Sequence, residues 1–195
     1  MAVAAAFASA PALAQPPKKT APAKTAPAKP APAKSAPVPA ASAALQGAQP
    51  NLLGQYADWG AYAAAGGDRK VCYALASPGS TRTTPPNRPR NQPYLFIATR
   101  MPENVKNEVS VIIGYPFKQD SEATVEIGSN KFVLYTKGDG AWISNAAEEA
   151  RMIEVMRKGS DLVVNGTSAR GTQSSDRYSL KGLSQALDRA ARECR

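Results

Sequence analysis

The chain has 195 residues, a formal net charge of +9, two cysteines and no histidine. The lack of histidine excludes Ser–His–Asp and Cys–His nucleophile arrangements and histidine-ligated metal sites. Lysines in residues 15–50 carry +5, and the remaining 19 basic and 15 acidic residues leave +4, so the charge does not describe a nucleic-acid-binding face.

Residues 1–14 have the composition of a signal peptide. Met1–Leu13 is almost entirely small and apolar, and Ala12-Leu13-Ala14 before Gln15 forms an A-x-A cleavage pattern. No basic residue precedes the apolar run, so two alternatives stay open: a signal peptide whose basic start lies upstream, and an Ala-rich leader that directs nothing. We expect no transmembrane segment after cleavage, because no other run reaches about 18 apolar residues.

Residues 15–50 are rich in Ala, Pro and Lys, and they repeat the pattern TAPAK. Regular proline favours the extended polyproline II conformation, and the lysines repel one another. The composition therefore predicts a disordered linker that is dispensable for folding. It is either a spacer that carries the domain away from a membrane or a leader with no specific role.

Residues 51–195 are predicted to form one globular domain, with a packing residue at Trp59. Turn signals separate short runs of β-branched and aromatic residues, and Gly128-Ser129 suits a type II′ hairpin. These runs predict strands at Lys70–Ala76, Tyr94–Arg100, Glu108–Tyr115, Ala123–Ile127, Asn130–Thr136, Asp161–Thr167 and Thr172–Leu180.

Two helices are predicted among and after these strands. The first begins after Asn145, a favourable N-cap, and ends at Gly159; its buried stripe is predicted at Ala146, Ala150, Met152, Ile153 and Met156. The second follows a pivot at Gly182, where apolar residues recur from Leu183 to Cys194 at i, i+3, i+4, i+7, i+8 and i+11. The expected fold class is α+β: a single domain of mainly antiparallel, sandwich-like sheet, with both helices on one face or end.

The two cysteines, Cys72 and Cys194, are 122 positions apart. They form no CxxC motif, which disfavours zinc binding and thioredoxin-type redox work. A structural disulfide is expected if the protein is exported, and free thiols are the alternative. Such a bridge ties the apolar stripe of the last helix to the strand at Lys70–Ala76.

The segment Ser77–Pro93 is predicted to be a loop, because it contains five prolines. It carries Arg82, Arg88 and Arg90 and no acidic residue. Together with Arg100, these guanidinium groups are candidates for gripping a carboxylate, sulfate or phosphate. The alternative is a solvated connector.

Four runs of the sequence carry distinctive motifs: Asn107–Phe117, Gly138–Gly159, Val164–Thr172 and Tyr178–Leu187. They resemble the invasion-associated locus B family of exported alphaproteobacterial proteins. The resemblance covers Trp59 to Cys194 and implies a periplasmic or surface-associated domain, in which Cys72 and Cys194 match the family's cysteine pair. It carries over no catalytic residue, and a role in host invasion does not follow from it.

Three functions are weighed from the sequence. The first is a non-enzymatic exported protein that binds an unidentified protein or envelope surface, not nucleic acid. The second is a binder of small anions through the four arginines. The third is an enzyme using Ser/Lys or paired carboxylates, which is disfavoured because S-x-x-K and G-x-S-x-G motifs are missing. No catalytic residue, cofactor or metal is expected.

Overall fold

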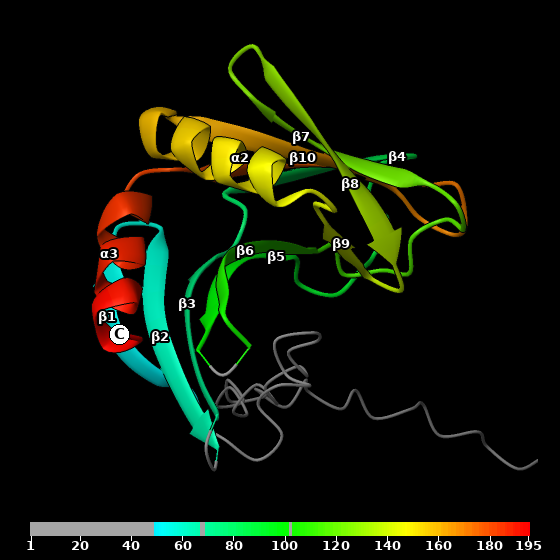
Figure 1. Cartoon of the computed structure of the whole chain (residues 1–195). Coiled ribbons are helices and arrows are strands. Elements are labelled where there is room, and N and C mark those ends of the chain that lie inside the picture. Colours follow the sequence, from blue (N-terminus) through cyan, green and yellow to red (C-terminus); the bar gives the residue numbers. More distant parts are fainter. Residues whose placement is uncertain (1–48, 67–68, 102) are drawn as a thin grey trace, which may run out of the picture. The chain divides into compact units, whose positions relative to one another are not determined.

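The computed structural model describes residues 49–66, 69–101 and 103–195 of the chain. The predicted signal peptide and nearly all of the predicted linker lie outside the described residues. The described part contains eleven strands and two helices (Figure 1). In chain order they are β1 (Asn51–Tyr56), β2 (Trp59–Gly66), β3 (Arg69–Ala76), β4 (Ser80–Thr84), β5 (Tyr94–Arg100), β6 (Val105–Ile112), β7 (Glu122–Ile127), β8 (Asn130–Lys137), β9 (Gly140–Trp142), α2 (Ala146–Lys158), β10 (Asp161–Thr167), β11 (Gln173–Ser179) and α3 (Leu183–Glu193).

The strands form one continuous sheet in the order β1-β2-β3-β5-β6-β9-β8-β7-β10-β11-β4, with β1 and β4 at its edges. Every pairing between neighbouring strands is antiparallel. The predicted α+β class, with a mainly antiparallel sheet and two helices, is confirmed. In the described part of the chain, neither helix is long and apolar enough to cross a membrane.

The main hydrophobic core lies on one face of this sheet. Its buried side chains come from β2, β3, β5, β6, β7, β8, β9, β10, β11 and both helices, and they include Trp59, Ile97, Phe132 and Tyr178. Strands near both ends of the strand order thus contribute to one cluster, so the sheet curves around the core. Both helices pack into that same cluster.

Four strands were not predicted from the sequence: β1, β2, β4 and the three-residue β9. The hairpin of β1 and β2 is built largely from Gly and Ala, which give no strand signal, and its two-residue turn holds Ala57 at φ +49° without a glycine. The segment Ser77–Pro93 is not a plain loop, because β4 lies within it and pairs with β11. β4 is an edge strand that is exposed along most of its length, so its sequence STRTT has no alternation of apolar and polar residues that would predict a strand.

Helix α2 begins after Asn145 and ends before Gly159, as the capping residues predict. The Asn145 side chain accepts hydrogen bonds from the backbone N–H of Ala147 and Glu148 at 2.9 and 3.1 Å. Its buried stripe is narrower than predicted: Met152, Ile153 and Met156 are buried as expected, but Ala146 and Ala150 are exposed. At about 100° per residue, the buried face formed by Met152, Ile153 and Met156 is centred near Met156, and Ala146 and Ala150 lie about 80° and 120° away from that centre.

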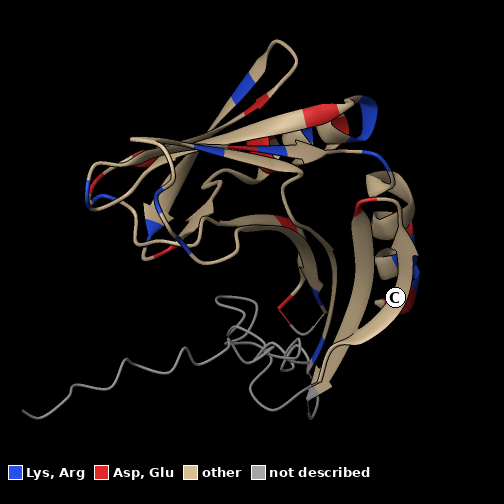
Figure 2. Ribbon diagram, turned by 180° about the vertical axis from the view of Figure 1, so that it is seen from behind, with Lys and Arg blue, Asp and Glu red and all other residues tan. Residues whose placement is uncertain are grey.

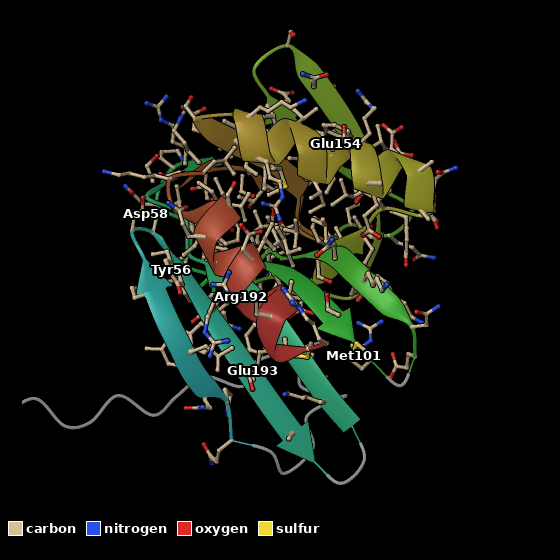
Figure 3. All side chains as sticks on the ribbon, turned by 60° about the vertical axis from the view of Figure 1, so that its left-hand side comes forward. Tyr56, Asp58, Met101, Glu154, Arg192 and Glu193 are labelled. Carbon is tan, nitrogen blue, oxygen red and sulfur yellow. A yellow bond between two sulfur atoms is a disulfide. The ribbon has the colours of Figure 1, made fainter. Side chains whose placement is uncertain are left out.

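Helix α3 lies against β1, β2 and β3 (Figure 3). Five of the six residues of the predicted apolar stripe are buried, namely Leu183, Ala186, Leu187, Ala190 and Cys194, whereas the sixth, Ala191, is exposed. Gly182 precedes the helix at φ +93°, and a Cβ built there would lie 1.9 Å from the Tyr56 carbonyl oxygen. The predicted pivot therefore combines a left-handed backbone with a close approach to the turn after β1.

A disulfide joins Cys72 on β3 to Cys194 after α3, with a Cα–Cα distance of 5.9 Å. The predicted bridge is confirmed. Lys70 reinforces the same junction, because its ammonium donates to the Glu193 carbonyl at 2.6 Å and to the Glu193 carboxylate at 3.1 Å. The hydrogen bond from Lys70 lowers the pKa of Glu193, and a second one from Arg189 adds to this.

Replacing Gly182 with Ala should destabilise the domain by about 3 kcal/mol or more. The new methyl group would clash with the backbone of Tyr56, and the alanine would also have to adopt a left-handed backbone conformation. Gly171→Ala is the matched control: its φ is +79°, but nothing lies within 4 Å of an added Cβ. We expect Gly171→Ala to cost only about 1–2 kcal/mol. Urea unfolding followed by circular dichroism compares the two, and equal losses would contradict the close approach.

Replacing Cys72 and Cys194 together with Ser should loosen α3 before the rest of the domain unfolds. A bridge across so long a loop contributes about 4–5 kcal/mol on the chain-entropy model, and α3 alone is too short to be stable in isolation. Amide hydrogen exchange should accelerate over residues 183–192 while β5 and β10 keep their protection. Uniform acceleration over the whole domain would instead mean that α3 and the sheet unfold as one unit.

Candidate functional site

The long connection from β4 to β5, together with β4 itself, surrounds a surface hollow. β4 pairs with β11, and the connection is held near its far end by a hydrogen bond from the Asn91 backbone N–H to the Gly114 carbonyl at 3.0 Å. Residues 78–84 and 86–93 surround a hollow of about 840 Å³. Arg82, Arg88 and Arg90 all line it, so three of the four predicted arginines come together.

Arg90 is the buried anchor of this connection. Its guanidinium makes a bidentate ion pair with Asp176 on β11, one contact being 2.8 Å from Nη1 to Oδ2 and the other a short Nη2–Oδ1 contact. It also donates to the Ile113 carbonyl at 2.9 Å. The Arg90 side chain is 8% exposed and the Asp176 side chain 0%. Burial raises the pKa of Asp176, and the guanidinium opposes that rise.

Two tyrosines and a serine complete the buried polar cluster. The Arg90 guanidinium lies 5.8 Å from the centre of the Tyr115 ring, and the Tyr115 and Ser174 hydroxyls are hydrogen-bonded at 2.5 Å. The Tyr178 hydroxyl is buried without a hydrogen-bond partner among the described residues. Burial raises the pKa of Tyr178 and also that of Tyr115, so both side chains are neutral at physiological pH.

Arg82 and Arg88 differ from Arg90 in being exposed and, within the described residues, free of ion pairs. Arg82 also borders a second, smaller hollow of about 520 Å³ over β4, β7, β10 and β11. Its lining is mostly hydroxyl and amide groups, with one carboxylate, Glu122. The loops at this end of the domain carry basic and acidic residues, whereas the ribbons of β1 and β2 carry none (Figure 2).

Arg100 does not join the other three arginines. It lies at the end of β5 and makes short ion pairs with Glu108 on β6 and with Glu103. The hydrogen bond with Glu108 is the main cause that raises the pKa of Arg100. Its charge is therefore already matched by two carboxylates, away from the hollow.

The arrangement could hold a polar or anionic group. The two free guanidinium groups supply charged donors, and the neighbouring Ser and Thr residues supply hydroxyls. Asp176 is fully occupied by Arg90, which removes it as a general base. No cluster of residues that could hold a metal ion occurs in the described part of the chain.

Comparison with known protein families gives one match, to the invasion associated locus B (IalB) protein family over residues 59–191. The chain belongs to the invasion-associated locus B family. The matched range begins at Trp59, the first residue of β2, and ends within α3. Searches of curated proteins and of solved structures found no match to the chain.

Membership of the invasion-associated locus B family agrees with the resemblance carried by the sequence runs. The matched range contains all four predicted arginines and Cys72, but it leaves out β1 and Cys194. The anion-binding role of Arg82 and Arg88 stays a prediction for this member of the family. Arg90 and Arg100 hold carboxylates of the protein itself.

The sequence did not reveal the partner of Arg90 or the buried hydroxyl of Tyr178. Asp176 is 86 positions from Arg90, and it stands in the polar run QSSDRYS of β11. Alternation along β11 could have revealed this site. Ser174, Asp176 and Tyr178 share one face of the strand, and the large aromatic ring of Tyr178 indicates that this face is the buried one. A carboxylate on an inner face requires a buried cation nearby.

Replacing Asp176 with Asn should destabilise the domain by about 3–5 kcal/mol, because the buried guanidinium of Arg90 loses its counter-charge. The double variant Arg90→Met with Asp176→Leu should lose less than the single one, since it removes both buried charges together. Asp161→Asn is the control: it breaks an exposed pair with Arg177 and should cost less than about 1 kcal/mol. Urea unfolding measures all three, and similar losses for Asp176→Asn and Asp161→Asn would contradict this account.

Proposed function

We propose that this member of the invasion-associated locus B family is an exported, non-enzymatic protein of the cell envelope or cell surface. It acts by binding another protein or an envelope component. The observation that carries the proposal is the Cys72–Cys194 disulfide, which closes the domain. Such bonds persist in oxidising compartments and are rare where thiols are kept reduced.

Features of the sequence support export and a binding role. Residues 1–14 resemble a signal peptide, and residues 15–50 have the composition of a spacer. The lack of histidine and the full use of Asp176 by Arg90 argue against acid–base catalysis at the hollow.

The connection from β4 to β5 is the proposed contact surface. Buried Arg90 fixes its far end, and the pairing of β4 with β11 fixes its near end, so the exposed residues between them start from a defined position. A pre-positioned loop loses little conformational entropy when it binds. Arg82 and Arg88 give it a preference for acidic groups on the partner.

A small anionic ligand is the second candidate. It is favoured by the two exposed guanidinium groups, Arg82 and Arg88, that border the same hollow. The two candidates differ in scale: a macromolecule contacts the outer surface of the connection, and a small ligand enters the hollow.

Replacing Arg82 and Arg88 with Ser should strongly reduce capture of the partner from envelope fractions of the producing cells. The matched control is Lys118→Ser with Lys137→Ser, which removes the same charge from exposed positions elsewhere. Mass spectrometry identifies what the wild type and the control retain and the arginine variant loses.

Three outcomes separate the ideas. Equal capture by both variants would remove the loop as the contact surface. Failure of the wild type to capture any component, together with saturable binding of phosphate or sulfate that depends on Arg82 and Arg88, would favour the small-ligand candidate. Thiol labelling of Cys72 and Cys194 in the native cellular protein, without a reductant, would contradict export.

A further inference from the structure

The sheet has a second face, opposite the main core, that reaches solvent over β8, β7, β10, β11 and β4. We call this side the outer face. Along β7, Ala123 and Val125 are buried in the main core, so Glu122 and Thr124 point to the outer face. Buried residues alternate with exposed or half-buried ones along β8, β10 and β11 as well. Both helices belong to the main core, so within the described part of the chain neither helix covers the outer face.

Strand register lines up polar side chains across the outer face. One row consists of register partners on four neighbouring strands: Arg82 of β4, Ser175 of β11, Asn165 of β10 and Thr124 of β7. A second row, two residues along, adds Thr84 of β4, Gln173 of β11 and Thr167 of β10. These side chains and Glu122 line the second hollow, of about 520 Å³, and we call them the polar strip.

Two aromatic rings continue the polar strip onto the next two strands. Glu122 is the register partner of Tyr135 on β8, and Tyr135 is the register partner of Trp142 on β9. The two ring centres are 5.8 Å apart, and the rings are tilted by 33°. Tyr135 is 50% exposed, and Val133 on the same face of β8 is 48% exposed. We call Tyr135 and Trp142 the aromatic platform.

Gly140 sets the orientation of Trp142. The two residues are separated by one position on β9, so they share a strand face. A Cβ built on Gly140 would lie 2.2 Å from Cη2 and 2.7 Å from Cζ2 of the Trp142 ring. The indole therefore lies over the bare backbone of Gly140 instead of standing up from the sheet. A ring held in this way presents a flat apolar surface.

The polar strip is electrically balanced. Arg82 is its one cation and Glu122 its one carboxylate. Neither makes an ion pair with another described residue. The other members are hydroxyl and amide groups, which both donate and accept hydrogen bonds. Such a surface favours a neutral ligand rich in hydroxyl groups over an anion or a cation.

We propose that the outer face binds a neutral glycan that has the extended, ribbon-like linkage of chitin and cellulose. The C–H bonds on the broad side of a sugar ring carry a small positive charge, and they pack against the negative face of an aromatic ring. The sugar hydroxyls then exchange hydrogen bonds with the amide, carboxylate, guanidinium and hydroxyl groups of the polar strip. An extended linkage is needed because the platform and the strip lie in one line across the strands.

The length of this line indicates an oligosaccharide rather than a single sugar. The line from Trp142 to Thr84 crosses β9, β8, β7, β10, β11 and β4, which are neighbours in that order. Five steps of about 4.8 Å make about 24 Å along the sheet. A single sugar covers only the aromatic platform or a part of the polar strip, so affinity should rise with the length of the glycan.

The first experiment is calorimetric titration of the full chain with chitohexaose, an uncharged hexasaccharide. Tyr135→Ser should weaken binding about tenfold, because it removes half of the aromatic platform. The matched control is Leu52→Ser on β1, where the side chain is 52% exposed, and it should bind like the wild type. Maltohexaose, whose linkage coils the chain, should bind at least tenfold more weakly than chitohexaose.

Three results of this titration overturn the proposal. The first is no binding of chitohexaose by the wild type at millimolar concentrations. The second is an equal loss in Tyr135→Ser and Leu52→Ser. The third is equal affinity for maltohexaose and chitohexaose.

The orientation of the indole is tested by Gly140→Ala. This variant keeps both aromatic side chains, but its methyl group occupies the place of the Trp142 ring. Chitohexaose binding should weaken about threefold or more while the circular dichroism spectrum stays unchanged. Unchanged binding overturns the aromatic platform as the stacking surface.

The polar strip is tested with Asn165→Ala and Gln173→Ala in one variant. The matched control carries Asn51→Ala and Gln55→Ala, which remove the same groups from exposed positions on β1. The test variant should bind chitohexaose about fivefold more weakly and chitobiose unchanged, since a disaccharide is held by the platform alone. Unchanged chitohexaose binding, or a loss equal to that of the control, overturns the proposed path of the glycan.

Arg88→Ser separates this site from the contact surface proposed on the β4–β5 connection, beyond which it goes. Arg88 borders the first hollow and not the second. The variant should therefore keep its affinity for chitohexaose even where it captures less of the proposed partner. A loss of chitohexaose binding as large as that of Tyr135→Ser would assign the glycan to the first hollow and overturn the proposal.

Discussion

The attachment of α3 to the first three strands is the constraint on which the rest of the domain depends. Its apolar stripe fills the core between β2 and β3, the Cys72–Cys194 bond fixes its far end, and Gly182 lets the chain turn tightly against Tyr56. Apart from Trp59, the core-facing side chains of β2 and β3 are small: Ala61, Ala74 and Ala76. These small residues permit close approach but give little hydrophobic stabilisation, so the covalent bond compensates for a thin layer of core.

The two halves of the sheet bury different kinds of side chain. At the β4–β11 edge a charged pair is buried, and Arg90 and Asp176 satisfy each other inside an otherwise apolar core. On β3 and β5 the second face is apolar and aromatic, and Tyr73 and Phe96 are buried on it. The buried ion pair fixes one loop in place and leaves Arg82 and Arg88 free at the surface.

Local signals made the helices and most strands predictable, and long-range pairing made the rest unpredictable. Asn145 and Gly159 bound α2 through capping, and the stripe from Leu183 to Cys194 marks α3, because each depends only on near neighbours. β1, β2 and β4 have weak propensity of their own and exist through their pairing with β3 and β11. Long-range pairing also made the Arg90–Asp176 ion pair unpredictable. Asp176 lies 86 positions from Arg90 on another strand, so only the arginines could be named from the sequence.

The open edges of the sheet have a consequence for how copies of this protein meet. β1 and β4 each have a neighbour on one side, and an exposed strand edge is a template for pairing with another chain. At β4 the side chain of Arg82 faces solvent, and a basic edge repels its own copy. β1 has no charged residue. Two molecules that approach through β1 therefore meet no charge repulsion along that strand, so β1 is the edge at which addition of a strand from another chain is electrostatically unopposed.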